Sequence, residues 1–189
     1  MIKILDFSKY NSWSSLDELR GLFKLSPAYK ENKVEGSPMF SVMGPMETEL
    51  EFCEVLYALV RATKPNLILE SGCGYGIATT FMGTAVVENG FGSVIAYEGS
   101  ADFCEMAKKN VAWLPVEVRL GSSLDYTGFA PDFIFLDSAS DTRTQEIQRW
   151  DGNDGVLAIH DAKRYPGAIS GGVFLDSYRT MWFRSTVRP

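Results

Sequence analysis

The chain has 189 residues, enough for one domain with a sizeable hydrophobic core. Hydrophobic residues make up 46% and charged residues 22%, and 24 acids against 18 bases give a formal charge of −6. A chain with this balance and no run of lysines and arginines is poorly suited to bind phosphate backbones, so no nucleic-acid partner is expected.

The N-terminus gives no sign of export. Residues Met1 to Tyr10 lack the sustained apolar core of a signal peptide, and no later stretch is apolar for long enough to cross a bilayer. The three cysteines, Cys53, Cys73 and Cys104, have neither disulfide nor metal-ligand spacing. We therefore expect a soluble, cytoplasmic protein with reduced thiols and no membrane partner.

The first 64 residues are predicted to form a helical lid packed on a core domain of residues 65–189. Ser15-Leu16-Asp17-Glu18 is a capping-box pattern that begins a first helix. A second helix is predicted to open at Gly44-Pro45, with Glu47 and Glu49 in a first turn that favours acids. The loop from Ser37 to Glu47 would complete the lid.

Beyond Pro65, strands alternate with helices. The predicted strands are Asn66 to Glu70, Ser93 to Glu98, Val116 to Leu120, Asp132 to Asp137 and Gly155 to His160. The predicted helices are Ile77 to Glu88, Ser100 to Val111 and Asp141 to Trp150. This alternation is typical of an α/β fold with a doubly wound, mainly parallel sheet. Ligands of such sheets bind outside the carboxyl ends of the strands, where this chain places Glu70, Glu98, Asp137, His160 and Asp161.

The C-terminus is predicted to be truncated. After Asp161 one strand is apparent, near Met181 to Val187, before the chain stops at Pro189. We therefore expect a sheet that lacks its seventh strand, with an open edge that a second copy of the chain covers in a homodimer.

A glycine loop follows the first predicted strand. Glycines at positions 72, 74 and 76 allow a tight turn and a close approach of the backbone to a ligand, and the next helix directs its free N–H groups at the same place. The dinucleotide pattern requires G-x-G-x-x-G, but Ile77 stands where its third glycine would be. That departure and the preceding Glu70 count against a nicotinamide cofactor.

Two further strand ends carry polar groups suited to a nucleoside. Glu98 closes the second strand, where a carboxylate can accept both ribose hydroxyl protons. Ser122 and Ser123 follow the third strand, and their hydroxyls can bond an adenine edge while leaving room for the ring. The alternatives are a solvated strand end for Glu98 and an ordinary turn for the serines.

Asp137, His160 and Asp161 are the candidate catalytic residues. His160 is the single histidine of the chain, and a neutral imidazole could take a proton from a substrate hydroxyl. Alternatively, the carboxylates of Asp137 and Asp161 could hold a divalent cation such as Mg²⁺ that lowers the pKa of that hydroxyl.

Together these residues resemble a class I S-adenosylmethionine-dependent methyltransferase over roughly Met46 to Arg164. The likeness is greatest to small-molecule O-methyltransferases of the catechol type and to a related group with a His-Asp pair after the fifth strand. It implies a Rossmann-like fold that binds S-adenosylmethionine and transfers its methyl group to a small hydroxylated acceptor. The residues that would hold the methionine part are Glu70, Gly72, Cys73, Gly74, Tyr75 and Gly76, while Glu98 would bind the ribose and Ser122, Ser123 and Asp137 would complete the cofactor site.

The chain departs from this pattern at the metal site. Ala162 occupies the place of an asparagine ligand, so dependence on Mg²⁺ is doubtful. Two alternatives to the enzyme remain: a non-catalytic or truncated protein that binds S-adenosylmethionine, and an NAD-dependent oxidoreductase on the same sheet topology.

Overall fold

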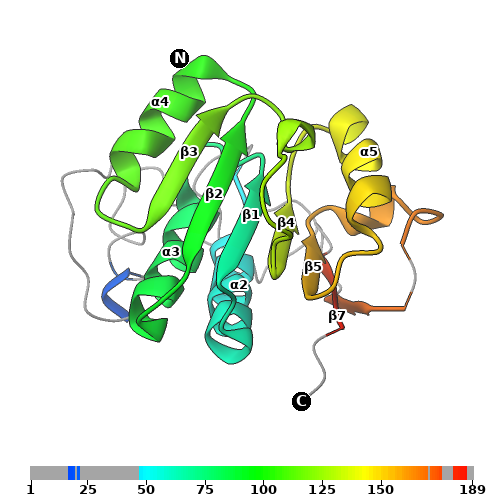
Figure 1. The fold of residues 1–189 in the computed structure, drawn as a ribbon, viewed down its shortest axis with the longest axis horizontal. Coiled ribbons are helices and arrows are strands. Elements are labelled where there is room, and N and C mark those ends of the chain that lie inside the picture. Colours follow the sequence, from blue (N-terminus) through cyan, green and yellow to red (C-terminus); the bar gives the residue numbers. More distant parts are fainter. Residues whose placement is uncertain (1–16, 20, 22–46, 170, 176–180, 187–189) are drawn as a thin grey trace.

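The computed structural model describes residues 17–19, 21, 47–169, 171–175 and 181–186, and these form an α/β fold around a seven-stranded sheet (Figure 1). The strand order is β3-β2-β1-β4-β5-β7-β6. The first five strands of that order are parallel, and β7 runs antiparallel to both β5 and β6. The strands are β1 (Leu67–Ser71), β2 (Ser93–Glu98), β3 (Val116–Leu120), β4 (Phe133–Leu136), β5 (Val156–Ile159), β6 (Val173–Leu175) and β7 (Met181–Ser185). The helices are α2 (Leu50–Thr63), α3 (Ile77–Asn89), α4 (Ala101–Asn110) and α5 (Ser140–Trp150), with 3-10 turns η1 (Ser123–Asp125) and η2 (Ala162–Arg164).

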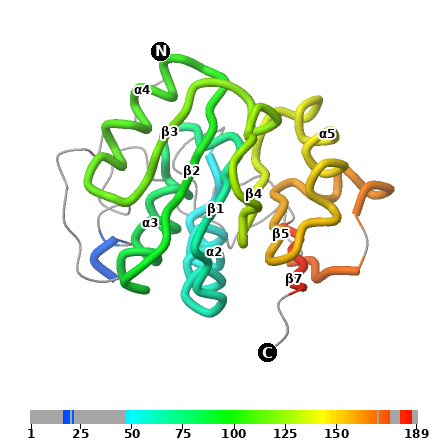
Figure 2. The backbone as a smooth tube through the Cα atoms, in the orientation of Figure 1, coloured from blue at the N-terminus to red at the C-terminus, as the bar shows by residue number. Residues whose placement is uncertain are grey.

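Helices cover both faces of the sheet because its inner strands are apolar on both sides. On one face, Ile68, Phe133 and Phe135 pack with side chains of α2 and α3, which lie side by side (Figure 2). On the other face, Ile134 and Leu136 pack with the buried side of α5. Successive residues of a strand point to opposite faces, so one short strand contributes to both cores.

The predicted fold class and the five parallel strands are confirmed. Predicted strands 93–98 and 116–120 have the same bounds as β2 and β3, and the others differ by one residue at each end. None of the helices in the described part of the chain is both long and apolar enough to span a membrane. The three cysteines are free and buried.

The predicted loss of the seventh strand is wrong. Residues Val173–Leu175 form β6, which pairs with β7 and completes a seven-stranded sheet within one chain. The strand has three residues, which is too short to show a clear alternation in the sequence, and it is held by its pairing with β7. The expectation of a homodimer that covers a missing strand loses its basis.

The predicted start of the second helix is also wrong. The helix α2 begins at Leu50 with Glu49 as its N-cap, so Glu47 and Glu49 precede the first turn. Gly44, Pro45 and most of the predicted lid, including 37–46, lie outside the described residues. Of the predicted first helix, residues 17–19 and 21 are described and are helical.

Candidate functional site

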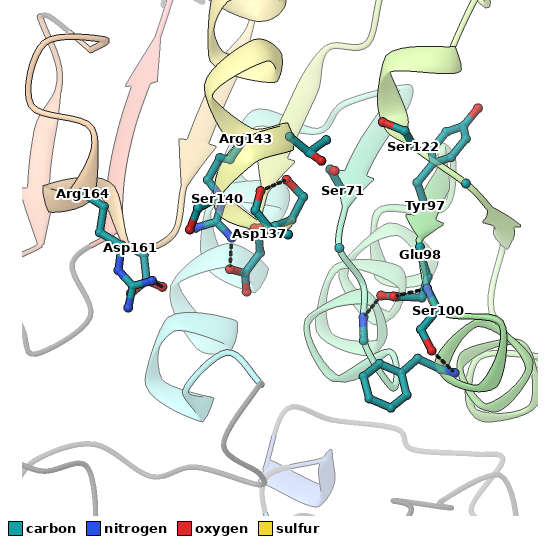
Figure 3. A pocket seen from close by; sticks show the side chains of 18 residues that line it. Ser71, Tyr97, Glu98, Ser100, Ser122, Asp137, Ser140, Arg143, Asp161 and Arg164 are labelled. Atoms are coloured by element: carbon teal, nitrogen blue, oxygen red, sulfur yellow. Dashed lines mark hydrogen bonds and ion pairs between the residues drawn. The ribbon is translucent and has the colours of Figure 1, made fainter.

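A cavity of about 810 Å³ lies at the carboxyl ends of the parallel strands (Figure 3). One end is bounded by the glycine loop, Glu98 and Ser122, and the other by the residues that follow β4 and β5. Its lining comprises Ser71, Gly72, Gly74, Tyr97, Glu98, Gly99, Ser100, Phe103, Gly121, Ser122, Asp137, Ser138, Ala139, Ser140, Thr142, Arg143, Asp161 and Arg164. This is the place where a parallel α/β sheet binds its ligand.

The loop between β1 and α3 requires glycine at two positions that border the cavity. Gly72 has a φ of 78°, and a Cβ atom there would lie 2.5 Å from the carbonyl oxygen of Asp137. Gly74 has a φ of 55°, and a Cβ atom would lie 2.7 Å from Oε1 of Glu47. Both conformations disfavour any residue with a Cβ, and at Gly72 the contact with backbone excludes one, so the backbone itself forms this wall of the cavity.

Glu98 is held in place by the backbone at the end of β2. One carboxylate oxygen accepts a hydrogen bond from the N–H of Gly74 at 2.8 Å, and the other accepts one from Ser100 at 2.8 Å. A carboxylate has about four acceptor positions, so each oxygen keeps the capacity for another hydrogen bond. Glu98 can therefore accept from two neighbouring hydroxyl groups of a ligand while its orientation stays fixed.

A buried carboxylate on α5 joins three serine hydroxyls beneath the cavity. Glu146 is fully buried and accepts hydrogen bonds from Ser71, from Ser123 at 2.5 Å and from Ser138 at 2.5 Å. The hydroxyl groups come from the ends of β1 and β4 and from η1. Glu146 thus fixes the relative position of three segments that border the cavity, and Ser123 serves this contact while Ser122 faces the cavity.

Asp137 lies at the centre of a buried network. Its Oδ2 accepts a hydrogen bond from Thr48 at 2.7 Å, and its Oδ1 accepts from Arg143 at 2.9 Å and contacts His160 Nδ1 at 3.0 Å. Burial would raise the pKa of Asp137, but the charges and hydrogen bonds of His160 and Arg143 outweigh burial and lower the pKa. Asp137 is therefore an anion with most of its acceptor capacity in use.

His160 is enclosed between two carboxylates. Its Nε2 lies 2.7 Å from Glu49 Oε2, its Nδ1 contacts Asp137, and its ring meets Phe52 edge-on with centroids 5.6 Å apart. Burial would lower the pKa of His160, but Asp137 and Glu49 outweigh burial and raise the pKa to about 10. At neutral pH the ring is a buried cation that donates from both nitrogens, so it has no free site to accept a substrate proton.

Asp161 is the third candidate catalytic residue, and it lies at the end of the cavity away from Glu98 (Figure 3). It follows β5 with a φ of 54°, which turns the chain sharply into η2. Its carboxylate is 3.8 Å from Arg164, a longer and weaker contact than those of Asp137. Asp161 is half-buried and borders the cavity, so it can accept a proton from a ligand there.

Two other acids lie behind the glycine loop, outside the cavity lining. Glu70 is fully buried and accepts a hydrogen bond from Thr79 at 2.6 Å, while Glu47 accepts one from the N–H of Tyr75 at 3.2 Å. Burial, reinforced by neighbouring carboxylates including Asp137 and Glu98, raises the pKa of each to about 8. Each of these groups is therefore largely protonated at neutral pH.

The structure brings six of the predicted site residues to the lining of the cavity, and the other six do not line it. Those that line it are Gly72, Gly74, Glu98, Ser122, Asp137 and Asp161, and those that do not are Glu70, Cys73, Tyr75, Gly76, Ser123 and His160. Tyr75 is buried and packs on Phe103, with ring centroids 4.6 Å apart.

Two groups of residues in the site were not predicted from the sequence. Arg143 and Glu146 share the buried side of α5 with Ile147 and Trp150. Charged residues at helical spacing within an apolar stripe are a usable signal, because charges are rarely buried without partners. No such signal exists for Thr48, whose partner Asp137 is 89 positions away in the chain.

The acids of the cavity do not fit a divalent metal site. The oxygens of Asp137 accept hydrogen bonds from Thr48 and from the cationic Arg143, and Asp161 faces Arg164. Within residues 17–19, 21, 47–169, 171–175 and 181–186, no group of three or more His, Cys, Asp and Glu side chains is arranged to hold a metal ion. We therefore derive no chemical step through a metal.

The chain is similar to known proteins in its structure, but no match was found from its sequence. No protein-family model matches the chain, and no curated protein matches it. Among solved structures, it is similar to the SAH-bound methyltransferase PaMTH1 of Podospora anserina, with a TM-score of 0.65, 13% identity and coverage of 96% of this chain and 93% of that one. It is also similar to an O-methyltransferase from Bacillus cereus in complex with SAH, with a TM-score of 0.64, 16% identity and coverage of 91% and 90%.

A third similar structure is the O-methyltransferase TomG from Streptomyces achromogenes in complex with SAM, with a TM-score of 0.60, 17% identity and coverage of 75% and 82%. The chain has the class I methyltransferase fold. At these identities the likeness shows the fold alone, so the function depends on the side chains of the cavity.

Proposed function

We propose that this protein is an S-adenosylmethionine-dependent methyltransferase that methylates a hydroxyl group of a small acceptor. The observation that supports this most directly is one cavity that joins the glycine loop, the oriented Glu98 and the acid Asp161. The cavity lies on a fold whose solved examples include SAM-bound and SAH-bound methyltransferases. We call the part near Glu98 and Ser122 the cofactor end and the part near Asp161 and Arg164 the acceptor end.

The residues of the cofactor end fit a nucleoside with a short side arm. The bare backbone at Gly72 and Gly74 allows a ligand to come within van der Waals contact of the loop. Glu98 would accept the two ribose hydroxyls, and Ser122 would lie near the base. When bound, S-adenosylmethionine supplies a methyl group on a positively charged sulfonium.

At the acceptor end, Asp161 is the group best placed to take the proton of the acceptor hydroxyl. His160 is protonated between two carboxylates, and Asp137 already accepts hydrogen bonds from Thr48 and Arg143. Asp137 and His160 would therefore have a structural role, in which their hydrogen bonds hold the segments around the cavity in place. Methyl transfer needs an aligned acceptor oxygen more than a strong base, so positioning by the cavity wall supplies most of the catalysis.

The test is transfer of a radiolabelled methyl group from S-adenosylmethionine to a panel of phenols, catechols and hydroxy acids. We expect transfer with at least one hydroxylated acceptor, and an Asp161→Asn variant that binds the cofactor normally but transfers about a hundredfold more slowly, as for loss of a general base. Tight cofactor binding with no transfer to any acceptor would instead favour a non-catalytic S-adenosylmethionine-binding protein. No binding of the cofactor would contradict the proposal.

A further inference from the structure

The helix α5 begins at the acceptor end, and residues of its first turn line the cavity. Its N-cap is Ala139, which has no side chain to cap the helix, and its first intrahelical bond runs from Arg143 N–H to the Ala139 carbonyl. Ser140 and Thr142, in the first turn, line the cavity, whereas the exposed Asp141 does not. The backbone N–H groups of this turn and the helix dipole favour a negative charge at this end.

A buried cation lies within the same turn. The side chain of Arg143 is 5% exposed, borders the cavity and donates to the His160 carbonyl at 2.8 Å and to Asp137. Its Nε atom is buried and has no hydrogen-bond partner among the described residues. This atom is enclosed by protein, so a ligand in the cavity would meet the positive charge of Arg143 rather than form a hydrogen bond to Nε.

A second arginine stands at the mouth of the cavity. The side chain of Arg164 is 63% exposed and lies 3.8 Å from the carboxylate of Asp161, which is 16% exposed (Figure 3). A guanidinium has five N–H donors, so among the described residues this one long contact leaves most of them available. Its planar pair of N–H groups matches a carboxylate in two parallel hydrogen bonds.

We propose that the acceptor carries a carboxylate beside its reacting hydroxyl, and that Arg164 binds this carboxylate, with the positive charge of Arg143 and of the α5 N-terminus favouring it. The inference rests on the proposed function and narrows its substrate class. Asp137 and Asp161 line the same cavity as Arg164 and would repel a dianion more than a monoanion. A carboxylate therefore fits better than a phosphate. Bound in this way, the acceptor would present its hydroxyl toward Asp161 and the cofactor end.

The experiment is calorimetric titration of the protein saturated with S-adenosylhomocysteine, using gallate, a hydroxylated aromatic carboxylate, and its neutral amide. We expect gallate to bind about tenfold tighter than the amide, as for a hydrogen-bonded charge pair. The variant Arg164→Gln should reduce this preference several-fold, because the charge of Arg143 and of the α5 N-terminus remains. The matched control is Lys163→Gln, which removes the same charge from an exposed neighbour that does not line the cavity and should keep the preference.

The inference would be overturned if the acid and the amide bound equally or if gallate did not bind. It would also be overturned if Arg164→Gln kept the full preference of the wild type. Saturating the protein with S-adenosylhomocysteine before the titration distinguishes failure of this inference from failure of the proposed function. Failure of S-adenosylhomocysteine to bind would contradict the methyltransferase itself, whereas failure of the gallate preference in the loaded protein would contradict the carboxylate site alone.

Discussion

The buried acid behind the glycine loop makes the stability of this fold depend on pH in a way that one substitution isolates. Glu70 is fully buried at the end of β1, with Oε2 bonded to Thr79 and Oε1 without a partner among the described residues. Replacing Glu70 with glutamine keeps the shape and the acceptor oxygen but removes the charge. The variant therefore measures the cost of ionising this one group in the core.

The size and sign follow from the pKa. Burial raises the pKa of Glu70 from 4.5 to about 8, and each unit corresponds to about 1.4 kcal/mol. The folded state therefore binds more protons than the unfolded state between these two values, so the contribution of Glu70 to stability is fully present below pH 4.5 and is lost as the pH rises to 8. Over this pH range, the free energy of unfolding of the wild type loses a contribution on the order of 5 kcal/mol from Glu70. The variant Glu70→Gln has no such loss.

The assay is urea unfolding of both proteins at several pH values from 5 to 8.5. We expect the free energy of unfolding of Glu70→Gln to rise relative to that of the wild type by several kcal/mol over this range. Glu47 titrates over the same range but is present in both proteins, so its direct contribution cancels. A difference between the two proteins that does not change with pH would refute the reasoning, because Glu70 would then be ionised in the folded protein.

Three further changes test the framework of the site. Glu146→Ala leaves three serine hydroxyls without their acceptor, so urea unfolding should show a loss of about 3 kcal/mol or more. Gly72→Ala forces a Cβ against the backbone of Asp137 and should abolish binding of S-adenosylhomocysteine by calorimetry, whereas Gly152→Ala, with nothing within 4 Å, should bind normally. Because Asp137 and Glu49 outweigh burial and raise the pKa of His160 from 6.5 to about 10, its stabilisation is complete below pH 6.5 and is lost as pH rises through 10. Unfolding of His160→Gln should lack this alkaline loss, and an unchanged pH dependence would contradict the assignment.

The parallel sheet could be predicted because its strands carry strong local signals. Each is a short apolar run bounded by turn residues, and the runs alternate with helices. The final pair of strands could not be predicted fully. The strand β6 depends on antiparallel pairing with β7, which is a tertiary contact that three residues of sequence do not specify.

The residues that line the cavity could be predicted where they follow strand ends. They could not be predicted where residues far apart in the chain come into contact. Glu98 and Asp161 were found because the fold determines where parallel strands terminate. The role of His160 was less predictable, because a lone histidine at a strand end has the same local sequence whether it is free or enclosed. Its state is decided by Glu49, which is 111 positions away and comes from the segment before α2.

The most direct test of the central claim is calorimetric binding of S-adenosylhomocysteine to the wild-type protein and to Glu98→Gln, with NADH as the competing ligand class. We predict micromolar binding of S-adenosylhomocysteine to the wild type and binding to Glu98→Gln that is weaker by about tenfold or more, because the amide forms poorer hydrogen bonds to the ribose. We predict no binding of NADH. Binding of NADH without S-adenosylhomocysteine, or equal affinity of the two proteins for S-adenosylhomocysteine, would contradict the central claim.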